Sequence, residues 1–436
     1  MDARSLPGPD RPRRTVVGIL LAALVVTACS GGTPASEPAD AAESGSPQGG
    51  ETGAAIELWS WNNEGAYPKV HEDAEQRFVA ANPGSTVTRT YLPFSDYITK
   101  FKAAVAAGQP PCIAQIPWAG EFRDFVESDG LIPLTEPLQS GFPAFFDPIV
   151  KAVTLDNEIW ALPLDVNTLQ IAYNKTVFDR LGLTIPKKQS DLLAVVERLE
   201  AEGLFGIAMG TKDKWSAGDL FFAQVAYTDG TNTLLAQGDA GTASWDDQAF
   251  LEAANNVAAM VSAGVFAPGA NSMDAFVGNL DLFASQRAAM MYPVGNFVTA
   301  GVADKVGDSF EWDLFPFPPP DDQASTAPVA TGGIAEMFVI TRDCPNQEQA
   351  IEFLRHLVNE DGGDALVAND FIPSWDYPVP ADKSPLYQNM VEAQSTAMSR
   401  VIYTTPVYTA LLNAMQGVMD GSVGGDDVIQ ALVDAR

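Results

Sequence analysis

Histidine and cysteine are scarce in this chain of 436 residues. The two histidines, His71 and His356, do not stand in a metal-binding spacing such as His-Glu-x-x-His, and Cys29, Cys112 and Cys344 are far apart. These counts argue against a zinc cluster and a Cys-x-x-Cys redox pair, and we expect neither metal nor cofactor. We interpret both histidines as ordinary helix-surface residues. The sequence also lacks G-x-S-x-G, P-loop and G-x-G-x-x-G motifs, which closes the most familiar catalytic routes.

Basic residues are also few. The chain has 25 Lys and Arg against 56 Asp and Glu, a formal net charge of −31. Such an acidic surface repels phosphate backbones and anionic headgroups, so nucleic acid and direct membrane-surface binding are poor expectations. Apolar residues make up 46% of the sequence. A chain of this length and composition can bury large cores and suits two lobes better than one.

The N-terminal segment has the pattern of an export signal. Arg11, Arg13 and Arg14 precede a short apolar run from residue 16 to 26, which ends in Val-Thr-Ala-Cys at Cys29. The run is too short to span a bilayer and fits the core of a signal peptide. The small residues before Cys29 resemble a bacterial lipobox, which implies cleavage after residue 28 and acylation of Cys29. A soluble secreted protein with an incidental Cys29 is the alternative.

A low-complexity segment follows the cysteine. Residues 30–54 contain no aromatic, no Val, Ile or Leu and no basic residue. We therefore expect 29–54 to be an acylated cysteine followed by a flexible tether with a reach of roughly 25–30 Å. The predicted localisation is extracytoplasmic, with the chain held at the cell membrane by its N-terminal lipid alone.

Strand and helix patterns alternate in the rest of the chain. Residues 56–61 predict a strand, a helical stripe begins at Val70, and residues 85–91 are Thr/Val-rich. A helix capped by Ser95, a strand at 113–116 and a helix at 121–128 continue the order. A βαβαβα order predicts an α/β fold with a parallel sheet covered by helices on both faces. Further predicted elements are a strand at 169–173 and helices that start at 190, 246 and 345.

Several sequence blocks carry a resemblance to a known family. Residues 159–168, Ile-Trp-Ala-Leu-Pro-Leu-Asp-Val-Asn-Thr, run on to Tyr-Asn-Lys at 173–175. This block resembles a hallmark of extracellular solute-binding protein family 1, the receptor lipoproteins of carbohydrate ABC importers, including the maltodextrin-binding group. Supporting blocks keep the family's order, and they lie at 58–61, 130–134, 283–297, 332–333 and 350–354. The chain departs from the family at Cys112, where Asp is usual, and at Phe297, where Trp is frequent.

The resemblance implies a two-lobed periplasmic-binding-protein-like fold of type II with three interlobe crossings. Lobe 1 would comprise 55–164 plus 316–371, and lobe 2 would comprise 165–315 plus 372–436. A mono- or oligosaccharide would bind in the cleft between the lobes, and hinge closure would present it to an ABC permease. The implied protein is a monomer without enzymatic activity.

Candidate ligand-binding residues follow from sugar chemistry, since hydroxyls bind carboxylates and amides whereas the C–H faces of a sugar stack on aromatic rings. A cluster of such residues ends the first predicted strand, where doubly wound sheets bind ligands: Trp59, Trp61, Asn62, Asn63 and Glu64. The resemblance adds Trp118, Glu121, Asp165, Asn167, Trp215, Asn296, Phe297, Gly332, Gly333, Trp375 and Tyr408. Core packing for Trp59, loop filling for Trp118 and hinge or turn formation for Asp165 and Asn167 are the structural alternatives.

In the resembled fold, the strands beside Cys112 and Cys344 both belong to lobe 1 and run antiparallel. Export allows paired thiols to oxidise, so we expect a disulfide between them, with two unpaired buried thiols as the alternative. Two other functions stay open. One is a receptor for a different solute such as a polyamine, and the other is a glycoside hydrolase that would pair Asp165 with Glu64 or Glu121.

Overall fold

The structure is a computed structural model. It describes residues 53–61, 66–117, 120–229, 233–323, 330–396, 398–399 and 404–436. The predicted signal peptide, Cys29 and most of the tether lie outside these ranges, and so do Asn62, Asn63, Glu64 and Trp118. Among the helices of the described ranges, none is both long enough and apolar enough to cross a bilayer.

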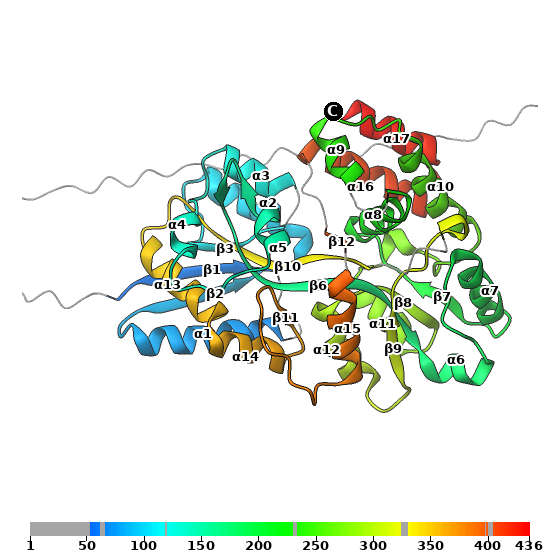
Figure 1. The fold of residues 1–436 in the computed structure, drawn as a ribbon, viewed down its shortest axis with the longest axis horizontal. Coiled ribbons are helices and arrows are strands. Elements are labelled where there is room, and N and C mark those ends of the chain that lie inside the picture. The colour runs from blue at the N-terminus through cyan, green and yellow to red at the C-terminus, as the bar shows by residue number, and fades with distance from the viewer. Residues whose placement is uncertain are drawn as a thin grey trace, which may run out of the picture. The chain divides into compact units, whose positions relative to one another are not determined.

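The first part of the folded unit follows the predicted βαβαβα order. Its parallel strands are β1 (Ala55–Ser60), β2 (Thr86–Tyr91) and β3 (Ile113–Gln115), with β1 in the middle. Figure 1 shows α1 and α14 on one face of this sheet and α2 and α3 on the other. These helices span Tyr67–Ala81, Glu360–Ala368, Phe94–Ala106 and Gly120–Glu127, respectively. The α/β fold class predicted from the sequence is confirmed.

Two long strands continue the sheet into the second part of the unit. The strand β6 (Leu162–Asn174) is buried along its whole length, and β10 (Thr331–Ile340) runs antiparallel to both β3 and β6. The first half of β6 pairs with β10 and β11 (Ile372–Pro373), whereas its second half pairs with β8 (Ala288–Val294) and β9 (Trp312–Phe315). The predicted strand at 169–173 is therefore one portion of a strand that passes from one half of the sheet to the other.

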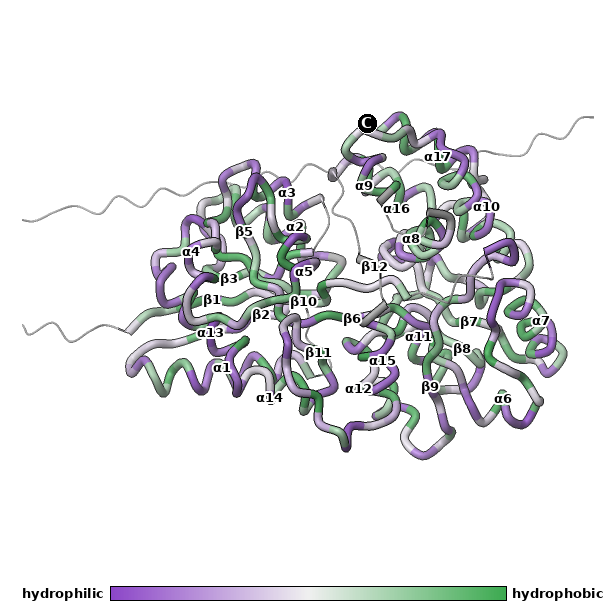
Figure 2. The backbone as a smooth tube through the Cα atoms, viewed as in Figure 1, coloured by the Kyte–Doolittle hydropathy of each residue, from purple (hydrophilic) through white to green (hydrophobic). Residues whose placement is uncertain are grey.

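Helices from both ends of the second part form one apolar cluster beyond β8 and β7 (Phe205–Ala208). The helices that pack together there are α8 (Trp215–Asp229), α10 (Gln248–Ser262), α16 (Thr405–Met419) and α17 (Gly425–Asp434). In α10, Phe250, Ala254 and Val257 recur at helical spacing and are fully buried, so this helix contributes one apolar face to the cluster. Figure 2 shows the same alternation of hydrophilic and hydrophobic residues along α1.

Further helices and short strands complete the described part of the unit. The helices are α4 (Thr135–Leu138), α5 (Asp147–Ala152), α6 (Lys175–Leu181), α7 (Gln189–Glu200), α9 (Thr233–Ala240), α11 (Val277–Ala284), α12 (Asn296–Val306), α13 (Gln347–Val358) and α15 (Pro385–Thr396). The short strands are β4 (Thr154–Leu155), β5 (Glu158–Ile159) and β12 (Met398–Ser399).

Cys112 directly precedes β3, and Cys344 follows the end of β10. Because these two strands are antiparallel neighbours, the start of one lies beside the end of the other. The structure joins the cysteines by a disulfide with Cα atoms 4.5 Å apart, across a sequence separation of 232 residues. The pairing that the resemblance implied is present.

Candidate functional site

A pocket lies where the two halves of the sheet meet, and it holds about 740 Å³ of space when its opening to solvent is included. The first half of the unit contributes Trp61, Tyr67, Phe94, Ile116 and Pro117, and the long strands contribute Asn167, Ile334, Ala335 and Met337. The second half contributes Trp215, Asp219, Phe276, Phe297 and Tyr408.

The topology explains why these residues meet. Trp61 and Ile116 directly follow the carboxyl ends of the parallel strands β1 and β3, the edge where doubly wound sheets bind ligands. Asn167 lies in the middle of β6, at the residue paired with Gly333 of β10. The pocket therefore combines strand ends of the first half with the strands that cross to the second half.

Trp61 forms an aromatic wall on the side of the first half. Its ring meets Phe94 and Tyr97 edge to face, with centroids 5.5 and 5.0 Å away. Its backbone N–H donates to Gln115 Oε1 (3.2 Å), which also accepts from Ser60 Oγ at 2.7 Å. The Trp61 ring is thus positioned by packing and backbone bonding before any ligand arrives.

Trp215 forms the wall on the opposite side. It is the first residue of α8, and its ring lies 5.6 Å from that of Phe276 and 6.3 Å from that of Phe297. Phe276 and Phe297 meet edge to face at 5.8 Å. Phe297 stands where the resembled family often has Trp, and it still supplies an aromatic ring to the pocket.

Two polar atoms of the pocket residues lack partners. Asn167 is only 3% exposed, and its Oδ1 accepts no hydrogen bond within the described part of the chain. Trp215 Nε1 is buried and likewise has no acceptor there. Asp219 adds a carboxylate that is 1% exposed. Because buried polar atoms are paired in most native structures, one free acceptor and one free donor beside a pocket indicate a polar ligand.

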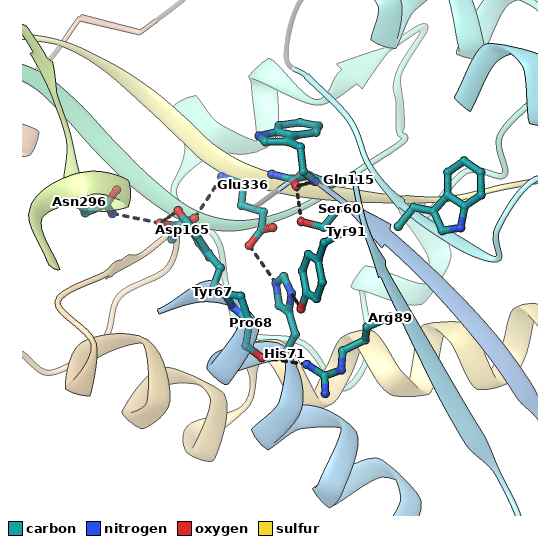
Figure 3. A network of polar contacts seen from close by, with 12 residues as sticks. Ser60, Tyr67, Pro68, His71, Arg89, Tyr91, Gln115, Asp165, Asn296 and Glu336 are labelled. Atoms are coloured by element: carbon teal, nitrogen blue, oxygen red, sulfur yellow. Dashed lines mark hydrogen bonds and ion pairs between the residues drawn. The ribbon is translucent and has the colours of Figure 1, made fainter. Parts of the chain in front are cut away.

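Asp165 is the centre of a second polar cluster beside the pocket (Figure 3). Its carboxylate is fully buried and accepts hydrogen bonds from Tyr67 Oη (2.8 Å), Asn296 Nδ2 (3.0 Å) and the backbone N–H of Glu336 at 3.1 Å. Burial, and then the nearby Glu336 carboxylate, raise the pKa of Asp165 well above its usual value. This cluster ties α1, β6, β10 and α12 together.

His71 extends this cluster, and the expectation that it lies on a helix surface is wrong. Its Nε2 lies 3.1 Å from Glu336 Oε2, its Nδ1 lies 3.1 Å from Tyr91 Oη, and the residue is 0% exposed. The reason is its helical position, since His71 shares the buried stripe of α1 with Tyr67 and Ala74. A buried imidazole on such a stripe needs polar partners, and the adjacent strands supply them.

The structure brings together part of the predicted site. Five predicted residues line the pocket: Trp61, Asn167, Trp215, Phe297 and Tyr408. Seven others do not: Trp59, Glu121, Asp165, Asn296, Gly332, Gly333 and Trp375. Trp59 Nε1 donates to Glu57 Oε1, and Trp375 is a 4% exposed core residue packed against Phe145 and Tyr377. For these seven residues, direct ligand contact finds no support in this geometry.

The sequence interpretation missed Tyr67, Phe94, Asp219 and Phe276. Two of them had a usable signal. Phe94 follows the end of β2 in the same way that Trp61 follows β1, and Asp219 lies four residues after Trp215 on one face of α8. Tyr67 and Phe276 come from helix starts whose neighbours in space are distant in sequence, so local pattern does not reveal them.

Known proteins resemble this chain over most of its length. An uncharacterized ABC transporter extracellular-binding protein of Pyrococcus horikoshii is 24% identical over 218 residues, a match that spans 47% of each chain, about half of that relative. A chitin oligosaccharide binding protein superposes with a TM-score of 0.76 at 21% identity, over 87% of this chain and 97% of the other. The GacH receptor of Streptomyces glaucescens, solved unliganded and with acarbose, gives 0.74 at 18% identity over 88% and 98%.

The family model for bacterial extracellular solute-binding proteins matches residues 61–364, which is well over half of the chain. That range contains β2 to β10 and most of the residues that line the pocket. The two-lobed fold of the similar structures agrees with a sheet that continues through β6 and β10. The chain therefore belongs to the bacterial extracellular solute-binding proteins.

Proposed function

We propose that this protein is the extracytoplasmic receptor of an ABC importer and that it binds a neutral mono- or oligosaccharide in the pocket between Trp61 and Trp215. Family membership supports the receptor role. Two relatives are named for an ABC transporter and for chitin oligosaccharide binding, and a third was solved with acarbose. These names are consistent with a carbohydrate ligand.

The arrangement of the pocket carries the proposal. Aromatic rings stand on both sides, with Trp61 and Phe94 on one and Trp215, Phe276 and Phe297 on the other. A sugar ring presents C–H faces to such walls, and hydroxyls at its edges. The free acceptor of Asn167 and the free donor of Trp215 fit those hydroxyls, since a hydroxyl both donates and accepts.

Transport would follow from closure of the two lobes around the sugar. The proposed lobes are 55–164 plus 316–371 and 165–315 plus 372–436, so one of the three crossings lies within β6 and the other two lie at 315/316 and 371/372. The pocket lining comes from both lobes, so a bound sugar makes its full set of contacts only when they are closed. Acylation of Cys29 would hold the receptor at the membrane beside its permease, and ATP hydrolysis would belong to a separate subunit.

The pocket does not favour the glycoside hydrolase alternative. Hydrolysis of a glycosidic bond commonly needs two carboxyl groups about 5–9 Å apart. Among the described residues that line the pocket, Asp219 is the one carboxylate, and Asp165 is enclosed by its own hydrogen bonds. Asp219 among aromatic rings does fit a protonated amine, so a polyamine is the second candidate ligand.

A binding screen tests the proposal. Maltotriose, chitobiose, xylobiose, raffinose and putrescine would each be titrated by calorimetry against the protein from residue 30 onward. We expect at least one sugar to bind and to be recovered uncut by chromatography after overnight incubation. Binding of putrescine alone would favour the polyamine, cleavage products would restore the hydrolase, and flat titrations with all five would contradict both receptor assignments.

A further inference from the structure

Two loops stand behind the wall that contains Trp215. One loop connects β7 to α8, and the other precedes α11. Their backbones are joined, because the N–H of Lys212 donates to Met273 O (3.1 Å) and the N–H of Thr211 donates to Ala270 O at 2.9 Å. The first loop ends at Trp215 and the second at Phe276, whose rings lie 5.6 Å apart in the pocket. The geometry of the two loops therefore sets the geometry of this aromatic pair.

Each loop carries an aspartate two residues before its aromatic residue. The backbone carbonyl of Asp213 accepts from the N–H of Trp215 at 2.8 Å. Asp274 Oδ1 accepts from the N–H of Phe276 (2.8 Å) and from that of Val277 (2.9 Å), so it caps α11. Any shift of either aspartate is thus passed directly to the ring that follows it.

The two loops are packed tightly where they carry these aspartates, since a Cβ on Gly210 would lie only 2.5 Å from the backbone carbonyl oxygen of Asp274. Two ionised carboxylates have no proton with which to hydrogen-bond each other. Asp213 Oδ2 is buried and has no partner among the described residues, although a proton on it would allow it to donate to Asp274. Burial first, and then the contact with Asp274, raise the pKa of Asp213 to about 6. Asp213 therefore gains or loses its proton near pH 6.

Other charges near the pair do not cancel this effect. Lys212 and the backbone N–H of Ala275 favour the ionised form of Asp213, but they act more weakly than burial and Asp274. Lys214 is directed elsewhere, because its Nζ donates to Asn413 Oδ1 of α16 at 2.6 Å. Asp420, which directly follows α16, accepts a hydrogen bond from Asn271 Nδ2 at 3.0 Å.

We propose that Asp213 and Asp274 are a positioning pair, and that the proton they share holds Trp215 and Phe276 in the arrangement that binds the ligand. When the proton is lost, the two charges repel, the loops separate and the aromatic wall loosens. Affinity then falls as the pH rises. This inference rests on the proposed function only where it concerns ligand binding, since the arrangement of the rings exists without a ligand.

The variant Asp213→Asn separates positioning from a merely structural role. Its amide donates to Asp274 at every pH, so it copies the protonated pair. Maltotriose and chitobiose would be titrated at pH 5 and pH 8 with EDTA present, so that no divalent cation can replace the proton. We expect wild-type affinity to be at least about fivefold weaker at pH 8, and the affinity of Asp213→Asn to be equal at both. The exposed Asp179→Asn is the matched control and should keep the wild-type profile.

Fluorine NMR of protein labelled with 5-fluorotryptophan tests the pair without a ligand. The Trp215 resonance is assigned by its absence from Trp215→Phe. It should titrate with a midpoint near pH 6 in the wild type and stay constant in Asp213→Asn. A Trp215 signal that is constant from pH 5 to pH 8 in the wild type, or that titrates equally in Asp213→Asn, would overturn the inference. If the signal titrates as expected while the screen is flat, the sugar proposal fails and the positioning pair stands.

Discussion

Two buried polar regions lie side by side in this protein, and they differ in what bonds their central polar groups. Around Asp165, the carboxylate accepts three bonds, and His71 is bonded through both ring nitrogens. At the pocket, Asn167 Oδ1 and Trp215 Nε1 have no partner among the described residues. Asn296 Oδ1, beside Asp165, also has none among them, but Asn296 does not line the pocket, so the unpaired atoms of Asn167 and Trp215 are the ones available to a ligand there.

This difference separates residues that we expect to stabilise the fold from residues that we expect to bind the ligand. Asp165 and Asn167 are two residues apart on one strand, and sequence alone assigns both to the ligand. Their side chains nevertheless have different surroundings, because the Asp165 carboxylate accepts hydrogen bonds from side chains of α1 and α12, whereas Asn167 lines the pocket. Variants of the first region should lose stability, and variants of the second should lose affinity.

The largest effect is expected from His71→Ala, since it leaves the Glu336 carboxylate buried without its imidazole partner. Removal of one member of a buried pair costs about 3–5 kcal/mol of unfolding free energy. His356→Ala is the matched control, because the ring nitrogens of His356 have no hydrogen-bond partner among the described residues and Nε2 lies 3.9 Å from the carboxylate oxygen Glu352 Oε1. We expect this variant to cost about 1 kcal/mol. Urea denaturation followed by circular dichroism measures both. Equal losses of unfolding free energy in the two variants would show that the bonds between His71 and the cluster around Asp165 do not add to stability.

Loss of the disulfide should be the next largest effect, and it should also be confined to stability. The double variant Cys112→Ser/Cys344→Ser opens a covalent loop with a sequence separation of 232 residues, which includes β6 to β9, and we expect a loss of about 2–4 kcal/mol. Because the bond is remote from the pocket lining, sugar affinity should not change. Mass spectrometry after alkylation without reductant checks the bond in the wild type. Two labelled thiols there would contradict the pairing.

Unlike the two preceding changes, Trp215→Ala should lower ligand affinity and leave stability almost unchanged. Loss of a ring that is boxed by Phe276 and Phe297 removes a stacking face and a free donor, so we expect affinity to fall by about 2 kcal/mol, roughly thirtyfold, with little change in stability. Trp375→Ala is the matched control, because Trp375 packs in the core and should lose about 3–5 kcal/mol of stability without a change in affinity. Calorimetry and denaturation of both variants decide the matter. If Trp375→Ala abolishes binding in a folded protein, the division between the two regions is wrong.

The sequence predicts the strands and helices of the fold better than it predicts the residues of the ligand-binding site. Periods of 2 and 3.6 locate β1 to β3 and the helices between them, because burial on one face is a local property. The conversion of 169–173 into part of the long β6 depends on partners more than a hundred residues away, and local pattern cannot reveal it. Aromatic residues at strand ends pointed to Trp61 and the resemblance pointed to Asn167, and both residues line the pocket. Whether a polar side chain already has a partner is a tertiary property, so the burial of His71 and the enclosure of Asp165 by donors of the protein could not be predicted from the sequence.

A comparison of two asparagines tests the division most directly. Asn167 and Asn296 are both 3% exposed, and the Oδ1 of each has no hydrogen-bond partner among the described residues. They differ because the Asn296 amide donates to Asp165 and to Val166 O, whereas Asn167 lines the pocket. Affinity by calorimetry and unfolding free energy in urea would be measured for Asn167→Ala and Asn296→Ala. We expect Asn167→Ala to bind the screened sugar about fivefold more weakly at wild-type stability. We expect Asn296→Ala to lose about 1–3 kcal/mol of stability, because Asp165 is left short of a donor. Wild-type affinity in Asn167→Ala together with the larger loss of stability there would contradict the account.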